Sequence, residues 1–150
     1  MLGELSKKQI DAILERQVTG RLGCHDSGLT YVVPINYVYK DGVVYAHSGP
    51  GKKIDMMRKN PGVCFEVDEI ENIFKWRCVI AWGRFEEVKD IEEQERAMQA
   101  LIHRIMPFVE TPAGHPSHGI TSNEYDLGTK IDLIIYKIQI TKATGRFEGS

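Results

Sequence analysis

Cysteine is scarce in this sequence, and the few cysteines present do not form a recognisable pattern. Cys24, Cys64 and Cys78 are odd in number and include no CxxC pair, which argues against a disulfide framework or a zinc ribbon. We interpret them as reduced thiols, as is typical of cytosolic proteins. No basic flank followed by an apolar run opens the chain, so we predict no signal peptide and expect a cytoplasmic protein.

Long apolar runs and an excess of one charge are missing as well. No apolar stretch reaches the roughly 18 residues that a membrane-spanning helix needs, and the net charge is −2. A charge so close to zero gives no basic field for nucleic acid or for an anionic membrane surface. The 150 residues, of which 42% are hydrophobic, suffice for a single domain with a substantial core.

The sequence does contain a succession of β-type segments separated by turn signals. There are six such segments, at 21–25, 29–39, 43–48, 63–68, 75–88 and 132–144. Each is dominated by residue types that fit a pleated, half-buried surface. Helices are predicted at 7–17, 53–59 and 90–106. Asp41-Gly42 is a strong hairpin signal, because a type I′ turn needs positive φ at both central residues. About six hairpin-linked strands with marginal helices predict an antiparallel β-barrel or a strongly curved sheet.

Pro34 interrupts the long run 29–39. A proline cannot donate a hydrogen bond to a strand ladder, so it is confined to an edge, a bulge or a corner. We predict that the strand bends at Pro34. Such a bend would leave nearby backbone groups free to meet something other than a neighbouring strand.

The segment from His47 to Lys53 is the most informative part of the chain. Here a predicted strand ends in a glycine-rich turn and a helix begins with Lys52 and Lys53. Lysines are unfavourable at this end of a helix, which carries partial positive charge, whereas a phosphate is favoured because its oxygens accept from the free backbone N–H groups. The alternative is that both lysines are solvated surface residues. The spacing of a Walker A loop is absent.

Other candidate ligand residues lie on the predicted strands. His47 suits hydrogen bonding or proton transfer near neutral pH, or it is a half-buried histidine satisfied by backbone. The amide of Asn36 suits a heterocycle with donors and acceptors, or it caps an interrupted ladder. Trp76 and Trp82 suit the cover of a ring system, and Arg77 suits a second phosphate contact. Tryptophans of the core or of a dimer interface are the more common alternative.

The histidines do not predict a metal site. His103 lies near the end of a predicted helix, where a cation is favoured in any case. His115 and His118 flank a Pro-Ser pair and have no cysteine nearby. They belong to the irregular segment 107–130, whose length is typical of a functional or mobile loop.

Taken together, these segments resemble a known family. The shared features are G-R-L-G-C at 20–24, Y-V-V-P-I-N-Y-V-Y at 31–39, D-G at 41–42, Y-A-H-S at 45–48, G-K-K at 51–53, N-P at 60–61, V-C-F-E-V-D at 63–68 and Gly83. They resemble the pyridoxamine 5′-phosphate oxidase-like FMN-binding split barrels, in particular their nitroimidazole-resistance and flavin-nucleotide-binding branch. The resemblance covers about residues 5–90 and is weaker beyond them.

The resemblance implies a six-stranded antiparallel split barrel over residues 1–150, and an obligate homodimer with FMN in two clefts between the subunits. Carried over by motif, the residues expected near the flavin are Val33, Pro34, Ile35, Asn36, His47, Ser48, Lys52, Lys53, Arg77 and Trp82. Within this set, the two lysines would hold the phosphate and the β-strand residues around Pro34 would run along the ring. His47 would correspond to the active-site histidine of the resistance branch.

The implied function is that of an FMN-dependent oxidoreductase that reduces a small acceptor, such as a nitroaromatic compound, with NAD(P)H as a candidate reductant. The flavin would carry the redox chemistry, which fits a sequence without an evident acid–base or nucleophile constellation. A flavin or nucleotide binder without catalysis fits that absence equally. A third alternative is a haem-handling barrel with His47 or the His115/His118 segment as iron ligand. An arginine-rich substrate site near the C-terminus is missing, which argues against oxidation of pyridoxamine phosphate itself.

Overall fold

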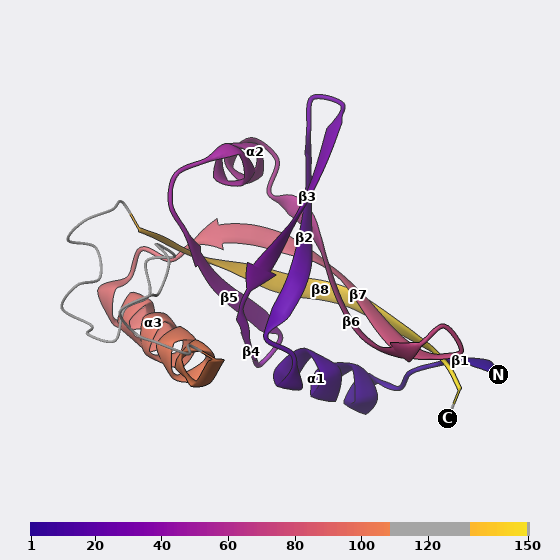
Figure 1. The fold of residues 1–150 in the computed structure, drawn as a ribbon. Helices are drawn as coiled ribbons and strands as arrows, with labels where there is room; N and C mark the ends of the chain where they lie inside the picture. Colours follow the sequence, from indigo (N-terminus) through magenta and orange to yellow (C-terminus); the bar gives the residue numbers. More distant parts are fainter. Residues whose placement is uncertain (109–132, 150) are drawn as a thin grey trace.

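Eight β-strands and three α-helices make up the part of the chain that the computed structural model describes, residues 1–108 and 133–149 (Figure 1). The strands are β1 (Leu2–Glu4), β2 (Thr19–Asp26), β3 (Leu29–Asn36), β4 (Val38–Lys40), β5 (Val43–Ser48), β6 (Gly62–Asn72), β7 (Lys75–Glu87) and β8 (Ile134–Glu148). The helices are α1 (Lys7–Arg16), α2 (Lys52–Lys59) and α3 (Ile91–Ile105), and a 3-10 turn (Met106–Phe108) follows α3. The predicted mainly β fold is confirmed.

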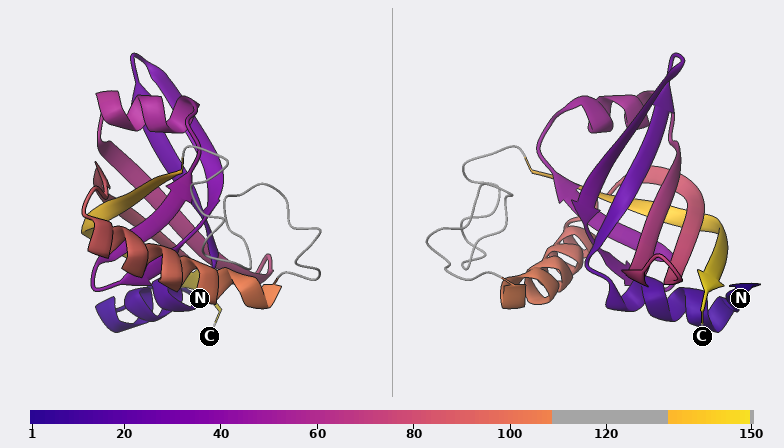
Figure 2. Two further views of the ribbon diagram at one scale, coloured as in Figure 1. Left: turned by 90° about the vertical axis from the view of Figure 1, so that its left-hand side faces the viewer. Right: turned by 45° about the vertical axis from the view of Figure 1, so that its right-hand side comes forward.

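All eight strands belong to one antiparallel sheet. Its order is β3-β2-β6-β7-β8-β5-β4, and β1 pairs with the end of β8. The six long strands correspond to the six predicted segments, but the segment predicted as one strand at 29–39 is divided into β3 and the three-residue β4. Only β1, also of three residues, lies outside the predicted segments. The sheet curls into a barrel (Figure 2). Its two outer strands, β3 and β4, are consecutive in the chain. Since no pairing joins these two within the described ranges, the barrel is split between them.

The chain turns between β3 and β4 at Tyr37, which is fully buried. Its N–H donates to the carbonyl of Val18 at 3.0 Å, and its hydroxyl donates to the carbonyl of Leu14 at 2.8 Å. The ring meets that of Phe65 edge-on, with centroids 4.8 Å apart. The corner is therefore held from inside the barrel by three separate contacts of one residue.

The predicted bend at Pro34 is wrong, because β3 runs unbroken past this residue. A two-residue turn joins β2 to β3, and both Ser27 and Gly28 have positive φ, 51° and 81°. Such a turn makes Asp26 and Leu29 the first hydrogen-bonded pair. Hydrogen-bonded and non-hydrogen-bonded residue pairs alternate from there along the two strands. The backbone nitrogen of Pro34 is therefore directed away from β2, so the proline removes no hydrogen bond of the ladder. The expected free backbone groups exist instead along the outer edge of β3, which no described strand pairs.

The strands β7 and β8 approach each other tightly at Gly83, where their register slips. A Cβ atom at this position would lie 2.3 Å from the carbonyl oxygen of Gln139. Only glycine therefore permits this approach, which accounts for the place of Gly83 among the sequence features of the split barrels.

The helices α1 and α2 lie at opposite ends of the barrel, and α3 lies beside it (Figure 2). Residues of α1 and α2 reach the barrel core, and their buried members are Ile10, Ile13, Leu14, Ile54, Met56 and Met57. The third helix, α3, packs Leu101 and Ile105 against a second apolar group that includes Ile135 of β8. Ser6 and Gln9 form a capping box at the start of α1.

At the start of α3, Asp90 and Glu93 form only half of a capping box. Asp90 accepts from the N–H of Glu93 at 2.9 Å, as expected for an N-cap. The carboxylate of Glu93 does not return to the cap but accepts from Tyr45 at 2.9 Å and from Lys137 at 2.8 Å. The Lys137 hydrogen bond, with that of Tyr45 adding to it, lowers the pKa of Glu93. This carboxylate therefore ties α3 to β5 and β8.

Two fully buried tyrosines make a matched pair for a stability test. Tyr136→Phe should raise the free energy of unfolding by about 1 kcal/mol, because its hydroxyl has no hydrogen-bond partner among the described residues. Tyr37→Phe should lower it by about 1 kcal/mol, because the bond to Leu14 is lost. Urea unfolding curves check both values. A loss of stability in both variants would contradict the account of Tyr136.

Candidate functional site

The candidate site begins at the start of α2, which no side chain caps. Gly51 is the N-cap residue and has extended backbone, so the first N–H groups of the helix lack a side-chain acceptor. Lys52 and Lys53 follow at once, and Asp55 is the acidic residue of this first turn. The prediction of a helix that starts with two cations after a glycine-rich turn is confirmed.

Lys53 is half-buried and is held by the end of β5. Its Nζ donates to Ser48 Oγ at 2.7 Å, and Ser48 in turn donates to the carbonyl of Gly49 at 2.8 Å. Burial lowers the pKa of Lys53, and the nearby Cys24 thiol opposes that shift. No described carboxylate lies within ion-pair distance of this ammonium group. A cation that is partly removed from water without a carboxylate partner is suited to an external anion.

Lys52 lies on the side of the helix start that faces β3. Its Nζ lies 5.2 Å from the centroid of the Tyr31 ring on β3, a distance typical of a cation–π contact. Consecutive helical residues point about 100° apart, so Lys52 is directed toward β3 while Lys53 is directed toward β5. The two lysines therefore flank the first turn of α2.

Cys24 lies behind this pair of lysines. Its Sγ is 3.7 Å from the carbonyl oxygen of Tyr31 and 4.0 Å from Met56 Sδ. The thiol is buried, and this burial raises its pKa. Cys24 thus borders the site as a small core residue that is not reactive.

The four predicted residues 33–36 lie along β3, beside this helix start. Side chains alternate, so that Ile35 is buried in the barrel while Pro34 and Asn36 are exposed. The side-chain oxygen of Asn36 accepts from Thr19 Oγ1 at 2.8 Å, which ties β3 to β2. The backbone groups of the exposed positions point away from β2, along the open edge of the sheet.

His47 and Ser48 are neighbours on β5, but their side chains face opposite sides of the sheet. Val44 and Ala46 point into the barrel core, and Ser48 shares their parity. His47 shares the parity of Tyr45, whose ring packs against the apolar group around α3. The structure therefore joins Ser48 to Lys53 and directs half-buried His47 to the other face. The role expected for His47 stays a prediction.

Arg77 and Trp82 line two other hollows. Trp82 lies on the outer face of β7, with Lys142 Nζ 5.4 Å from its ring, and lines an open groove of 550 Å³ that also includes Val32. Arg77 lines a separate hollow of 280 Å³ with Trp76 near the chain ends. Neither residue joins the two lysines in the described contacts, and the prediction that they contact the flavin stays a prediction.

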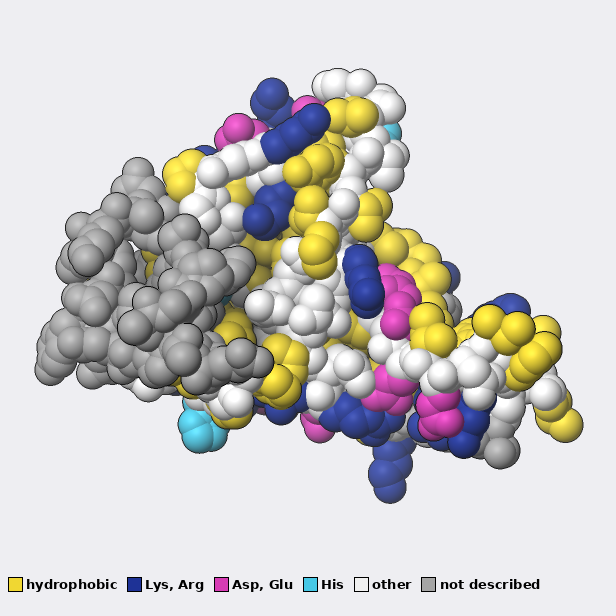
Figure 3. All heavy atoms as spheres, viewed as in Figure 1, with side chains coloured by type: hydrophobic (Ala, Val, Ile, Leu, Met, Phe, Trp, Pro, Cys, Tyr) yellow, Lys and Arg dark blue, Asp and Glu magenta, His cyan; other side chains and the backbone are white. Residues whose placement is uncertain are grey.

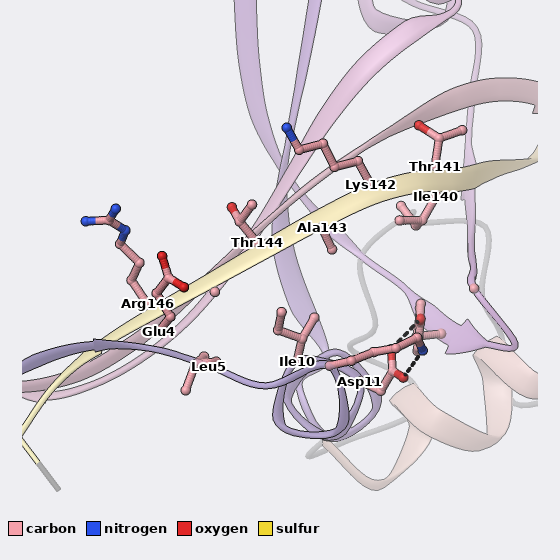
Figure 4. Close-up of a pocket in the computed structure, with 14 residues that line it drawn as sticks. Glu4, Leu5, Ile10, Asp11, Ile140, Thr141, Lys142, Ala143, Thr144 and Arg146 are labelled. Atoms are coloured by element: carbon pink, nitrogen blue, oxygen red, sulfur yellow. Dashed lines mark hydrogen bonds and ion pairs between the residues drawn. The ribbon is translucent and has the colours of Figure 1, made fainter.

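A further hollow of 670 Å³ lies between α1, β1 and β8 and contains no predicted site residue (Figure 4). Asp11 lines this hollow. Its carboxylate accepts from Lys7 Nζ at 2.7 Å and from the Tyr39 hydroxyl at 3.0 Å. The Lys7 hydrogen bond lowers the pKa of Asp11, and the Tyr39 hydroxyl adds to that shift. The carboxylate of Asp11 thus links α1 to β4.

The described residues contain no cluster of three histidine, cysteine or acidic side chains placed to hold a metal ion. His115 and His118, considered above as ligands of a haem iron, lie outside the described residues. Within the same described ranges, no helix combines the length and apolar character needed to cross a bilayer.

Tyr31 is the site residue that reasoning from single residues missed. It appeared only within the motif at 31–39, although a signal for it was present. Counting outward from the two-residue turn places Tyr31 opposite Cys24, on the side of β3 that faces α2 and the barrel interior.

Comparison with known proteins supplies the family. The family model described as pyridoxamine 5′-phosphate oxidase matches residues 6–147. The chain belongs to this family. The match includes α3 and β8, and so extends well beyond the part of the chain in which the sequence motifs were recognised.

Individual proteins similar to this member of the pyridoxamine 5′-phosphate oxidase family span nearly all of it. An uncharacterized protein of Rhizobium meliloti is 32% identical over 142 residues, which are 95% of this chain and 92% of that protein. A FAD-binding protein from Mesorhizobium loti is 31% identical, with a TM-score of 0.77 over 99% of each chain. A candidate 5-nitroimidazole antibiotic resistance protein from Bacteroides thetaiotaomicron is 21% identical, with a TM-score of 0.73 over 98% of this chain and 87% of that one. The last of these shows a shared fold.

Proposed function

We propose that this chain binds FMN, with the terminal phosphate at the start of α2 and the ring along the open edge of β3. The observation that carries the proposal is the uncapped first turn of α2, flanked by Lys52 and Lys53. In a homodimer, the bound flavin would serve the reduction of a small acceptor such as a nitroaromatic compound. The 31% identity to a FAD-binding protein supports a flavin as the ligand.

The helix start fits a phosphate for two reasons. Its free N–H groups and the helix dipole favour an anion, and both cations of the first turn are then neutralised at once. The half-buried ammonium group of Lys53 would gain a charged acceptor in addition to Ser48, and hydrogen bonds between charged groups are about twice as strong as neutral ones. A terminal phosphate, with its two negative charges, balances the two lysines.

The edge of β3 fits the ring system. Because Val32, Pro34 and Asn36 direct their backbone groups outward, the edge offers N–H and C=O groups in alternation, with one N–H removed by the proline. The pyrimidine part of a flavin presents N–H and C=O groups along one side, which such an edge complements. Binding of the ring would also occupy an unpaired strand edge, which is otherwise a site of aggregation.

The chain's own contribution to the reaction would be to bind and orient the flavin, which supplies electron and hydride transfer when bound. His47 is the proposed proton donor, because imidazole titrates near neutral pH. The Cys24 thiol beside the lysines is no candidate nucleophile, since it is buried with a raised pKa.

A second copy of the chain is the proposed cover for the outer face of β3, β2, β6 and β7. On this face Val32 is 61% exposed and Trp82 is 39% exposed, and Figure 3 shows hydrophobic side chains gathered along the β2–β3 hairpin. Arg21 lies 3.6 Å from Asp68 and 3.8 Å from Glu66 on the same face. A face with aromatic residues and charges of both signs suits association with an identical copy.

The flavin proposal predicts that the lysines act on the phosphate alone. Replacing both Lys52 and Lys53 by Met should weaken FMN binding by about 2 to 3 kcal/mol, roughly 30- to 150-fold. Riboflavin, which has no phosphate, should bind both proteins equally. Fluorescence titration measures both affinities, and Lys59→Met in the last turn of α2 is the control. A wild-type protein that binds neither compound would contradict the proposal, and chromatography of the flavin released on denaturation distinguishes FMN from FAD.

The proton-donor role predicts a loss of turnover without a loss of cofactor. His47→Ala should lower the rate of acceptor reduction by NAD(P)H about 100-fold, within the range for a general acid, while the FMN dissociation constant stays within about twofold. His25→Ala, on the exposed part of β2, is the control. Unchanged turnover of His47→Ala with every accepted substrate would exclude the role.

The dimer proposal predicts that a single charge on the outer face separates the subunits. Trp82→Glu should convert a dimer into a monomer in sedimentation experiments, because a carboxylate would be buried in an aromatic contact. Ile91→Glu adds the same charge at an exposed position of α3 and should leave the dimer intact. A wild-type monomer at micromolar concentration would exclude the proposed assembly.

A further inference from the structure

The two lysines at the start of α2 are held by two different devices. Lys53 is held by a hydrogen bond to Ser48 Oγ at 2.7 Å, and that hydroxyl is itself fixed because it donates to Gly49. Lys52 is more exposed than Lys53, and the contact described for it is with the face of the Tyr31 ring, 5.2 Å from Nζ.

An exposed lysine has a flexible stem of four carbons and loses much side-chain entropy when it is held in one place. A ring that already attracts the ammonium group reduces the loss at the moment of binding, because part of the ordering precedes the ligand. An aromatic face can do this without neutralising the charge, whereas a carboxylate at the same place would compete with a phosphate. Tyr31 therefore suits the preorganisation of an anion-binding lysine.

The backbone of Tyr31 is well placed for such a task. Its strand is paired along its whole length with β2, where Tyr31 lies opposite Cys24. Cys24 Sγ lies 3.7 Å from the Tyr31 carbonyl oxygen, and the thiol packs on Met56 of α2. The ring is half-buried against the barrel core. Strand and helix are thus joined directly beneath the contact between Lys52 and Tyr31.

We infer that Tyr31 is a positioning residue for the phosphate end of the ligand, and that its ring, through Lys52, increases the preference of this protein for a phosphorylated flavin over the unphosphorylated one. The inference rests on the proposed FMN site. It adds a residue that acts through Lys52 and has no need to touch the ligand. The hydroxyl group of Tyr31 plays no part in it.

The test compares two ligands and two substitutions. The ratio of the dissociation constants of riboflavin and FMN isolates the contribution of the phosphate. In Tyr31→Leu this ratio should fall about two- to fivefold, which corresponds to an exposed cation–π contact. Tyr31→Phe keeps the aromatic face and should keep the wild-type ratio. Fluorescence titration measures both dissociation constants in each protein.

A double-mutant cycle separates positioning from a general effect on folding. In a Lys52→Met background, Tyr31→Leu should leave the ratio unchanged, because the ring then has no cation to hold. Tyr39→Leu removes another half-buried tyrosine, on β4, and should leave the ratio at its wild-type value. A fall of the ratio in Tyr39→Leu would mean that loss of packing alone explains the result for Tyr31.

The outcomes distinguish this inference from the proposal beneath it. If the wild type binds neither flavin, or binds both equally, the proposed phosphate site fails. If the wild type prefers FMN and Tyr31→Leu keeps that preference, the phosphate site stands and the inference is overturned. A Tyr31→Phe variant that loses the preference as Tyr31→Leu does would also overturn it, because the hydroxyl would then be the active group.

Discussion

The register between β2 and β3 is the constraint on which the candidate site depends. A two-residue turn at Ser27 and Gly28 fixes which positions of β3 bond to β2. That alternation turns the backbone of Pro34 toward the open edge and the ring of Tyr31 toward α2. A shift by one residue would exchange these roles, remove a ladder bond at the proline and separate Tyr31 from Lys52.

The start of α2 is electrostatically unfavourable by itself, in contrast to the ion pairs found elsewhere in the fold. Two lysines lie at the helix N-terminus, where acidic residues are preferred, and Lys53 is partly desolvated by burial. Some charges elsewhere are closely paired, as at Glu69, which accepts from Arg16 at 2.5 Å and from Gln17 at 2.6 Å. Because the Arg16 hydrogen bond lowers the pKa of Glu69, this link favours the folded state near neutral pH. A local departure of this kind is typical of functional sites.

The same architecture separates the proposed functions in space. The phosphate site lies at α2, the ring site lies along the edge of β3, and the proposed subunit contact lies on the outer face of the sheet. β3 contributes to all three, since Tyr31 faces inward, Val32 faces outward and the backbone edge lies between them. An edge strand alone offers three distinct surfaces in this way, because a central strand has both of its edges paired.

The sequence by itself determined the local features of this protein. The turns at Ser27-Gly28 and Asp41-Gly42, the Ser6 cap and the lysine-led helix after Gly51 all follow from interactions within a few residues. Tertiary structure alone decided that the chain turns at Tyr37, that Ser48 rather than His47 lies on the face of β5 that points into the barrel, and that Arg77 lies in a different hollow from the lysines. These depend on which strand is an edge and on what packs against each face, and such contacts join residues too distant in sequence for any local pattern to specify.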